Sequence, residues 1–448
     1  MHLSEVGAKI GAQVSGHDAW FEGVSTDTRT ISNGELFCAL SGPNFDGHEH
    51  CRDAEEKGAV GAIIERAVET DLPTLTVDDT RRALGRLAGA WRSRFSVPVV
   101  GVTGSNGKTT VKEMIASILQ VDADVLATKG NFNNDIGVPK TLFELAEQHK
   151  YAVIEMGASS RGEIKWLAEV TQPLVGVITL CAPAHLEGFG SIDAVAKAKG
   201  ELYVGLIADG TAIINADDVY ANYWSNVASD RRIVKFGLQK LADVYAETVT
   251  DRGIGNGMQF RLCLPTDKVD IELPFDGIHS VSNALAAAAV AYTLDVSSAA
   301  IKYGLENATP VGGRLCVLDG ICGSRIIDDT YNANPASLAA AINIVASVPG
   351  EKWLVLGDMG ELGSSAAEIH HETGLNVRNA GIDRLYTFGE LAAIAGIAYG
   401  DGARSYRDMG ELIKILAAEV DREVTVLVKG SRAMEMERIV EVLVGENR

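Results

Sequence analysis

Long apolar runs are absent from the sequence: no segment reaches the ~18–20 consecutive apolar residues that a membrane-spanning helix needs. The first residues, MHLSEVGAKIGAQVSG, also lack the basic start and the continuous apolar stretch of a signal peptide. None of the six cysteines belongs to a CxxC pair. Together these absences predict a cytoplasmic protein with free thiols and no membrane span.

Basic stretches are absent too, and the formal net charge is −20. Without clustered Lys and Arg, the chain offers nothing that would neutralise the phosphates of a long nucleic acid, so we expect no nucleic-acid partner. An anionic small molecule can bind only where local cations, a metal or a helix N-terminus reverse the field. Hydrophobic residues make up 46% of the chain and charged residues 22%, which is typical of a soluble globular protein.

The chain of 448 residues is too long for one core, and it contains no internal repeat or low-complexity segment. The pattern of strands, helices and turns changes along the chain and predicts three domains, residues 1–82, 83–312 and 313–448. The first mixes short strands with glycine-rich turns, as in STDTRTISNGELFCALSGPNFDGHEH. We therefore predict an α/β protein with a mixed N-terminal domain, a central parallel-sheet domain of the P-loop ATPase type and a C-terminal Rossmann-like domain.

The middle region alternates strand and helix patterns. VPVVGVTG is a buried strand entering a glycine-rich turn, and TTVKEMIASILQ after it carries apolar residues on one helical face. Further strand candidates are YAVIEMG, PLVGVITL and GTAIINADD, which predicts a mostly parallel sheet covered by helices. Residues 238–276 contain short segments in which apolar and polar residues alternate, so we expect an antiparallel flap or small sheet there. Residues 282–294, SNALAAAAVAYTL, predict a helix.

The last region contains four strand signals, RIIDDTY, KWLVLGDM, DRLYTFGE and EVTVLVKG, separated by helix-like segments. Polar residues stand at the ends of these strands: Asp328, Asp329, Asp358 and Lys429. Because ligands of open α/β sheets bind at the carboxyl ends of the strands, these side chains are candidates for a binding site.

The segment GVTGSNGKTT, residues 101–110, predicts a phosphate-binding loop. Glycines let consecutive backbone N–H groups converge on phosphate oxygens, and the following helix adds its positive N-terminal end. Lys108 can then reach the β- and γ-phosphates of a nucleotide, and the Thr109 hydroxyl can bind Mg²⁺. The strict G-x-x-x-x-G-K-[ST] pattern fails by one position, because Val102 stands where its first glycine should be.

Such a loop alone does not name a reaction. The alternative interpretation is a tight glycine turn between strand and helix, and kinases, switch GTPases and transport ATPases share the pattern. No N-K-x-D segment for guanine occurs in the sequence, which argues against a GTPase.

Several other polar residues follow strands or glycines. Glu155 ends the strand YAVIEMG and can face Mg²⁺ or simply cap the next turn. His185 follows the next strand, where a histidine is more often a loop hydrogen-bonder than a ligand. Lys199 is indistinguishable by itself from a solvated helix lysine. Arg314 follows two glycines and can clamp a γ-phosphate or be an ordinary surface residue.

The motifs together resemble the Mur ligases, the ATP-dependent amide-forming enzymes of bacterial peptidoglycan synthesis. They occur in family order as GVTGSNGKTT, TKGNFNNDIGVP, IEMGAS, APAHLEGFGS, AKAKGELY, HSVSNALAA, PVGGR, DDTYNANPAS, LGDMGELG and VKGSRAMEME. The first and the GGR motifs are shared by all Mur ligases and by folylpolyglutamate synthetases. GNFNN, YNANPAS, GDMGELG and KGSR are similar to the branch that adds D-alanyl-D-alanine. STDTR and ALSGPNFDGH resemble a uridine-nucleotide domain, so the likeness covers essentially the whole chain.

The resemblance implies roles for individual residues. The ATP-binding residues would be Gly104, Ser105, Asn106, Gly107, Lys108, Thr109, Thr110, Asn283, Arg314 and Asp329, with His279 near the adenine and Asp328 as the alternative to Asp329. The metal ligands would be Thr109, Glu155, His185 and Lys199, the last as a carbamate, and the catalytic residues Lys108, Lys199, His185 and Arg314. The nucleotide-sugar site would comprise Ser25, Thr26, Asp27, Arg29, Asn44, Asp46, His48, Asn131, Asn133 and Asn134. The dipeptide would meet Asn332, Asn334, Lys429, Ser431 and Arg432.

The reaction that the resemblance implies is ligation of D-alanyl-D-alanine to UDP-N-acetylmuramoyl-tripeptide through an acyl phosphate, with ATP and Mg²⁺ and in a monomer. The nearest alternative is another amide ligase, such as a folylpolyglutamate synthetase. An alternative of another class is a regulatory nucleotide switch, which would bind ATP without forming a bond. Polar strand ends in a second α/β domain argue against the switch.

Overall fold

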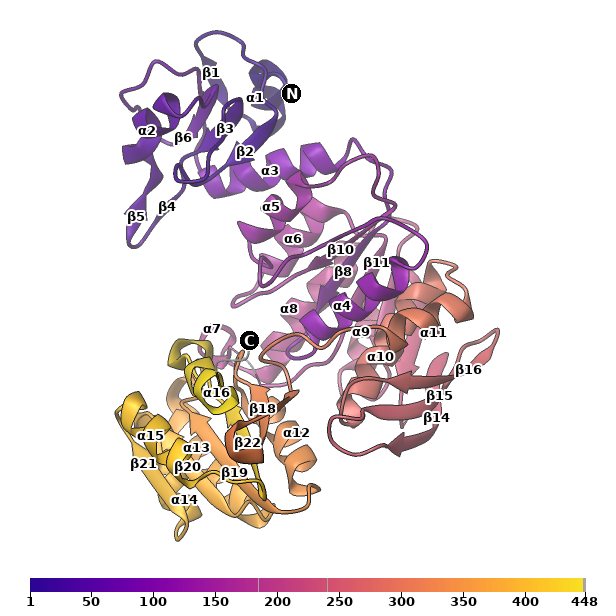
Figure 1. Ribbon diagram of the computed structural model, residues 1–448. Coiled ribbons are helices and arrows are strands. Elements are labelled where there is room, and N and C mark those ends of the chain that lie inside the picture. Colours follow the sequence, from indigo (N-terminus) through magenta and orange to yellow (C-terminus); the bar gives the residue numbers. More distant parts are fainter. Residues whose placement is uncertain (184, 240, 446–448) are drawn as a thin grey trace.

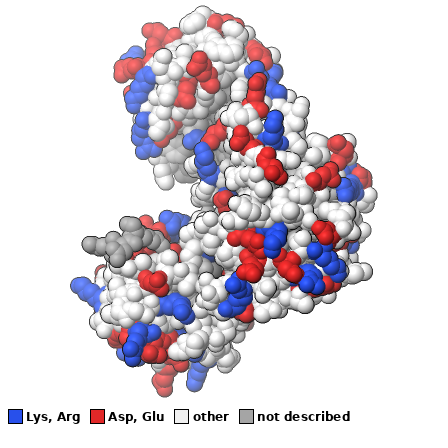
Figure 2. All heavy atoms as spheres, turned by 45° about the vertical axis from the view of Figure 1, so that its right-hand side comes forward, with Lys and Arg blue, Asp and Glu red and all other residues white. Residues whose placement is uncertain are grey.

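The computed structural model describes residues 1–183, 185–239 and 241–445, which form three consecutive α/β domains (Figure 1). In these ranges, no helix is both long and apolar enough to cross a membrane. The first domain lies at one end of the molecule, and the third returns beside the middle one. A space-filling view shows a deep notch between the lobes of the first and third domains (Figure 2).

The first domain is built on a five-stranded sheet of order β1-β7-β6-β3-β2. β1 pairs antiparallel with β7, and the other pairs are parallel. Its strands are β1 (Gln13–Ser15), β2 (Gly23–Ser25), β3 (Glu35–Cys38), β6 (Gly61–Ile64) and β7 (Thr74–Thr76), with a hairpin of β4 (Ser41–Gly42) and β5 (Phe45–Asp46). Its helices are α1 (Leu3–Ile10), η1 (Gly47–His50) and α2 (Cys51–Glu56). Apolar side chains such as Leu3, Leu36 and Leu75 form its core.

Helix α3 (Thr80–Arg92) joins the first domain to the middle one. Asp79 caps it by accepting a hydrogen bond from the Arg82 backbone N–H at 2.8 Å. Leu84 and Leu87 pack into the first core, whereas Ala88 packs into the middle one. The predicted boundary at residue 82 falls in the first turn of this shared helix.

The middle domain contains a nine-stranded sheet of order β16-β15-β14-β13-β12-β11-β8-β10-β9. The strands are β8 (Val99–Thr103), β9 (Val125–Ala127), β10 (Tyr151–Glu155), β11 (Val175–Ile178), β12 (Thr211–Asn215), β13 (Arg232–Gly237), β14 (Val244–Asp251), β15 (Met258–Cys263) and β16 (Lys268–Leu273). Along the sheet from β9 to β13 all pairs are parallel, as predicted, and β14 adds a further parallel pair with β13. Their carboxyl ends therefore meet at one edge of the sheet.

Residues 238–276 differ in part from the prediction. Their strands β14–β16 are antiparallel to one another, but they extend the central sheet instead of forming a separate one, because β14 pairs with β13. Phe260, Leu262 and Ile271 pack into the same core as the helix over them. A local alternating pattern predicts the strands but not the partner at their edge.

Helices cover both faces of the middle sheet. One face carries α4 (Lys108–Leu119), α10 (Ile278–Thr293) and α11 (Ser298–Glu306). The other carries α5 (Gly137–Phe143), α6 (Glu163–Thr171), α8 (Ile192–Val204) and α9 (Ala221–Val227), and the short helix α7 (Leu186–Phe189) packs against α8. The predicted apolar face of α4, including Val111, Met114 and Ile118, is buried against the sheet. This packing fixes where the phosphate loop ends and the helix begins.

The third domain is a six-stranded sheet of order β17-β18-β22-β19-β20-β21, parallel except for β17. Its strands are β17 (Cys316–Asp319), β18 (Arg325–Asp329), β19 (Glu351–Gly357), β20 (Arg384–Phe388), β21 (Ala403–Tyr406) and β22 (Val424–Lys429). The helices are η2 (Ile321–Gly323), α12 (Pro335–Ala346), η3 (Gly363–Ser365), α13 (Ala366–Asn379), α14 (Glu390–Tyr399), α15 (Met409–Glu419), η4 (Arg432–Met434) and α16 (Glu437–Val444). The four predicted strands are β18, β19, β20 and β22. Prediction missed β17 and β21, which are short edge strands without a continuous buried run.

Candidate functional site

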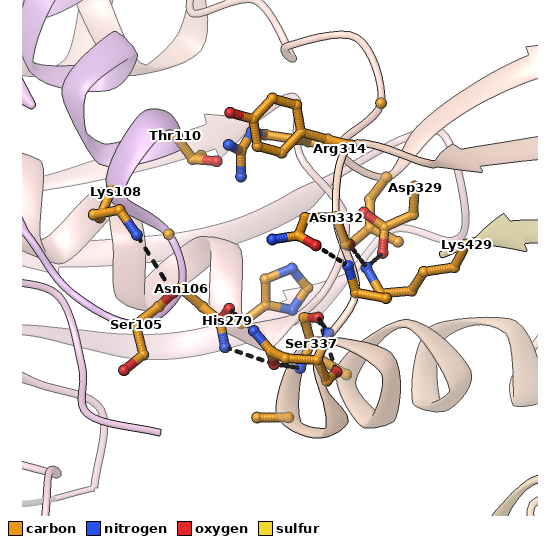
Figure 3. A pocket seen from close by; sticks show the side chains of 18 of the residues that line it. Ser105, Asn106, Lys108, Thr110, His279, Arg314, Asp329, Asn332, Ser337 and Lys429 are labelled. Carbon is orange, nitrogen blue, oxygen red and sulfur yellow. Dashed lines mark hydrogen bonds and ion pairs between the residues drawn. The ribbon is translucent and has the colours of Figure 1, made fainter. Parts of the chain in front are cut away.

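A cavity of about 920 Å³ lies between the middle and third domains, where the carboxyl ends of both sheets meet (Figure 3). Its walls come from the loops after β8, β16, β18, β19 and β22. The predicted site residues that line it are Ser105, Asn106, Gly107, Lys108, Thr110, His185, His279, Asn283, Arg314, Asp329, Asn332, Asn334, Lys429, Ser431 and Arg432. Residues separated by more than 300 positions thus face one space.

Two glycines give the phosphate loop its shape. Gly107 has a φ of 79°, and a Cβ there would lie 2.6 Å from the Asn283 Oδ1. A Cβ on Gly104 would lie 1.7 Å from the Thr179 Oγ1. That hydroxyl instead donates a hydrogen bond to the Asn106 carbonyl at 2.6 Å. Both positions therefore need glycine for close approach, and Gly107 needs it also for its left-handed backbone.

Three positive groups converge beyond this loop. Lys108 stands at the N-terminus of α4, and its Nζ donates to the Gly104 carbonyl at 2.9 Å. Arg314 approaches from the junction with the third domain and donates from Nη2 to the Thr109 Oγ1 at 2.8 Å. Its guanidinium stacks 4.0 Å from the ring centre of Tyr331. A helix N-terminus, an ammonium and a guanidinium together suit the terminal phosphates of a nucleotide.

Glu155 is the strongest metal-ligand candidate. It ends β10 as predicted and is buried, and its Oε1 accepts a hydrogen bond from the Asn133 Nδ2 at 2.8 Å. Its Oε2 is buried and has no hydrogen-bond partner among the residues that the structure describes. A buried carboxylate oxygen left without a donor suits a hard divalent cation. Within the described ranges no group of three or more His, Cys, Asp and Glu side chains gathers around it.

Lys199 and His185 lie close enough to Lys108 for its positive charge to affect both side chains. Lys199 is buried on α8, and this burial lowers its pKa to about 7, with a further lowering from the positive charge of Lys108. Burial lowers the pKa of His185, whereas Glu361 opposes this and the charges of Lys108 and Lys199 add to it. The His185 Nδ1 lies 2.5 Å from Oε2 of Glu361, a third-domain residue.

Asp329 and Lys429 end the neighbouring strands β18 and β22 and form a buried ion pair. Lys429 also donates to the Asn332 carbonyl at 2.9 Å. Burial raises the pKa of Asp329, and Lys429 acts against this rise. Asp328 instead accepts from Thr330 Oγ1 at 2.6 Å and from the Gly313 backbone at 3.2 Å. Of the two alternatives, only Asp329 lines the cavity.

Asn334 connects the third domain to the phosphate loop. Its side chain accepts from the Ser337 backbone N–H at 2.9 Å and so caps α12. Its Nδ2 donates to the Asn106 Oδ1 at 2.6 Å, and the Asn106 Nδ2 donates back at 3.3 Å. The residue predicted for the dipeptide therefore also contacts the ATP loop.

The predicted uridine residues gather in the first domain, away from the cavity. Asp27 and Arg29 form a bidentate ion pair, which holds the pKa of Asp27 well below its usual range. His48 is buried between the Asp46 Oδ1, 2.7 Å from its Nδ1, and the Glu65 backbone N–H, which donates to its Nε2 at 2.9 Å. Both ring nitrogens of His48 are thus used within the protein. Ser25, Thr26 and Asn44 lie on the same two segments.

The Asn131–Asn134 loop lies between β9 and α5. Asn133 contacts Glu155, whereas the Asn134 Oδ1 accepts from the Gly137 backbone N–H at 2.8 Å at the start of α5. Asn131 is exposed. The loop therefore joins the metal-ligand candidate to the side of the middle domain that α3 links to the first.

The sequence gives no individual role to several residues that line the cavity, among them Tyr331, Asp276 and Glu361. Tyr331 lies in DDTYNANPAS, whose density of polar residues predicts a ligand loop, and Glu361 lies in the motif LGDMGELG, but the sequence does not say what either side chain contacts. Asp276 accepts hydrogen bonds from the backbone N–H groups of Gly255 and Gly257 at 2.8 and 3.0 Å. These partners are distant in the sequence, so no local pattern predicts the contacts.

Comparison with known proteins finds one family along the chain. The model of the Mur ligase middle domain matches residues 102–291, that of the glutamate ligase domain residues 313–432, and that of the Mur ligase family catalytic domain residues 20–92. UDP-N-acetylmuramoyl-tripeptide–D-alanyl-D-alanine ligase of Escherichia coli is 41% identical over 98% of both chains. The enzyme of the same name from Haemophilus influenzae is 40% identical over 94% of this chain and 93% of its own.

Solved structures agree with these matches. A crystal structure of MurF from Acinetobacter baumannii superposes with a TM-score of 0.91 at 34% identity, covering 98% of this chain and 97% of that one. MurF from Thermotoga maritima in complex with ADP gives a TM-score of 0.82 at 28% identity, with 94% and 96% covered. The likeness therefore includes all three domains together.

Proposed function

The chain belongs to the Mur ligase family, and from this premise we propose that it joins D-alanyl-D-alanine to UDP-N-acetylmuramoyl-tripeptide with the use of ATP. The product is a pentapeptide precursor of peptidoglycan, with ADP and phosphate released. One observation carries the assignment to this chain's own site: the phosphate loop, Arg314 and the third-domain strand ends line a single cavity.

The chemistry explains why these groups must meet. A carboxylate acylates poorly because oxide is a poor leaving group. Transfer of the γ-phosphoryl group of ATP to the peptide carboxylate gives an acyl phosphate and ADP. The dipeptide amine then attacks the carbonyl carbon, loses a proton, and the tetrahedral intermediate expels phosphate.

Lys108 and Arg314 serve the first step. Two anions, the peptide carboxylate and the triphosphate, must approach each other, and the two cations reduce their repulsion. They also stabilise the charge that spreads over the transferring phosphoryl oxygens. Tyr331 holds the Arg314 guanidinium by stacking, so that less side-chain freedom is lost when phosphate binds.

Mg²⁺ is part of the proposal. Bound ions would supply further charge neutralisation at the phosphates. Thr109 and Glu155 would hold one ion, and the unpaired Glu155 Oε2 supports that choice. His185 and a carbamate on Lys199 would hold a second. Burial of the Lys199 amine favours its neutral form, which is the form that reacts with CO₂.

In this proposal each domain binds one of the three substrates. We assign the nucleotide-sugar to residues 1–82, ATP to residues 83–312 and the dipeptide to residues 313–448. The first-domain residues would be Ser25, Thr26, Asp27, Arg29, Asn44, Asp46 and His48, with Asn131, Asn133 and Asn134 between that site and the ATP loop. Asn332, Asn334, Lys429 and Ser431 would meet the dipeptide. The enzyme would act as a cytoplasmic monomer.

The test is ADP release with UDP-N-acetylmuramoyl-tripeptide, measured with and without D-alanyl-D-alanine. We expect release to depend on both substrates and the pentapeptide to appear by mass spectrometry. A panel of other amine acceptors separates this reaction from that of other amide ligases. ADP release that ignores every acceptor would contradict the proposal.

The Lys108→Ala variant tests the phosphate loop. Its turnover should fall by roughly 100-fold or more, because a preorganised positive group at the transferring phosphoryl is lost. Circular dichroism should remain unchanged, since within the described part of the chain the Lys108 ammonium donates only to the loop carbonyls of Gly104 and Ser105. Lys197→Ala, an exposed lysine on α8, is the matched control. Near-normal turnover of Lys108→Ala would overturn the assignment.

A further inference from the structure

Glu361 is a cavity residue to which the reaction has so far given no task. It stands in the loop after β19 with a φ of 61°, and its side chain is 57% exposed and lines the cavity. Residues 360–363 pack against residues 185–187 of the middle domain: the Glu361 carbonyl accepts from the Glu187 backbone N–H at 3.4 Å. The Glu361 side chain is therefore held at the border between the ATP half and the dipeptide half.

The other acidic residues of the cavity wall are already engaged. Asp329 is paired with Lys429, and Asp276 accepts two backbone N–H groups. Among the described lining residues, Glu361 alone carries a carboxylate with neither a Lys or Arg partner nor a backbone donor. Among the residues that the structure describes, the polar group next to this carboxylate is the His185 Nδ1, at 2.5 Å. It can therefore accept a further donor from a ligand.

The charge of the cavity decides what that donor is. The remaining charged groups on the wall, Lys108, Arg314 and Arg432, are cations, and they suit phosphates and carboxylates, although Arg432 also pairs with Glu437 at 2.8 Å. They repel an ammonium group. The incoming dipeptide carries an ammonium at one end and a carboxylate at the other, so it needs one negative anchor in a cation-rich space.

We propose that Glu361 binds the ammonium group of the incoming dipeptide, which gives up a proton before its nitrogen attacks, and so selects an amine as the acceptor, an inference that rests on the proposed function. Gly360 lies beside Ser431: a Cβ added to this glycine would lie 3.7 Å from the Cβ of the serine. Ser431 and Arg432 are thus close enough to hold the rest of the same small molecule. On the other side, His185 places the carboxylate next to the middle domain, where the acyl phosphate forms.

The test compares an amine with a hydroxyl. D-lactoyl-D-alanine differs from D-alanyl-D-alanine only by an uncharged hydroxyl in place of the ammonium. Its inhibition constant against D-alanyl-D-alanine, set against the KM of the amine, measures how strongly the site selects positive charge. In the wild-type enzyme we expect the amine to be preferred by roughly 10-fold or more, because a hydrogen bond between charged groups is lost with the hydroxyl.

The Glu361→Gln variant removes the charge and keeps the shape, including an oxygen that can face His185. We expect the KM for D-alanyl-D-alanine to rise by roughly 10-fold or more, the KM for ATP to stay, and the preference for the amine to disappear. Glu368→Gln, which removes an exposed carboxylate on α13 outside the cavity, is the control and should keep the preference.

The outcomes are separable. If Glu361→Gln lowers turnover but keeps the wild-type preference for the amine, Glu361 acts only by positioning His185 and the inference is wrong. Unchanged KM and preference would also overturn it. If the wild-type enzyme releases no ADP in response to D-alanyl-D-alanine, the proposed function itself fails, and the variant comparison is not needed to see it.

Discussion

Lys199 and Lys197 occupy the same helix two residues apart, but their surroundings differ completely. Lys199 is buried and Lys197 is exposed. Because burial disfavours the charged form, the pKa of Lys199 falls to about 7. As pH rises through about 7, the Lys199 amine becomes neutral and can add CO₂.

We expect Lys199→Ala to lose activity by at least the roughly 10- to 100-fold that changes around a metal site cost, and short-chain carboxylic acids to restore part of it. In ¹³C NMR with labelled bicarbonate, the wild-type protein should give a carbamate signal that grows as pH rises through about 7 and is missing in Lys199→Ala. Lys197→Ala should behave as the wild type. Absence of both signal and rescue would remove the carbamate from the proposed metal site.

Helices α4 and α6 begin alike, and only one of them begins at the cavity. Gly107 and Gly162 are their N-cap residues, both in the left-handed region with φ of 79° and 85°. A Cβ on Gly162 meets nothing within 4 Å, whereas a Cβ on Gly107 meets the Asn283 Oδ1 at 2.6 Å. Substituting each glycine by alanine therefore separates two effects. Both substitutions strain the left-handed backbone, but only the one at Gly107 also crowds the proposed ATP site.

Gly162→Ala should lower the free energy of unfolding by about 1–2 kcal/mol, the cost of a left-handed non-glycine residue, and leave the KM for ATP unchanged. Gly107→Ala should show a similar or larger loss of stability and also raise the KM for ATP by roughly 10-fold or more, because displaced backbone N–H groups no longer meet phosphate. Urea unfolding and steady-state kinetics measure the two effects. An unchanged KM in Gly107→Ala would count against this loop as the phosphate site.

At the scale of the whole molecule, the proposed uridine site and the cavity belong to different domains with a notch between their lobes (Figure 2). A nucleotide-sugar peptide held in the first domain must present its carboxylate to Lys108. Approach of the domains would achieve this and would keep water from the acyl phosphate.

We expect small-angle X-ray scattering to show a smaller radius of gyration than that of the free protein when a non-hydrolysable ATP analogue and UDP-N-acetylmuramoyl-tripeptide are both added. The free protein should exceed the roughly 22 Å of a compact chain of 448 residues. The ATP analogue with D-alanyl-D-alanine alone serves as the control. No change with the full set of ligands would show that the substrates bridge the domains as they stand.

The sequence by itself determined the local parts of this protein. The buried run before a glycine turn, the periodic face of α4 and the polar ends of three third-domain strands depend on neighbours within one or two turns. Such patterns are dictated by backbone sterics and by burial of one face, so they can be read along the chain. Resemblance to known motifs then attached functions to them.

Only the tertiary structure decided which of these parts meet. The Asn106–Asn334 pair, the Asp329–Lys429 ion pair and the His185–Glu361 contact each join residues far apart in the chain. The edge position of β14–β16 likewise depends on β13. A local pattern fixes the face that a residue presents, but the partner across that face is chosen by the packing of whole sheets and helices. That the Glu361 carboxylate has neither a Lys or Arg partner nor a backbone donor in the described part of the chain became visible only once the partners of Asp329 and Asp276 were known.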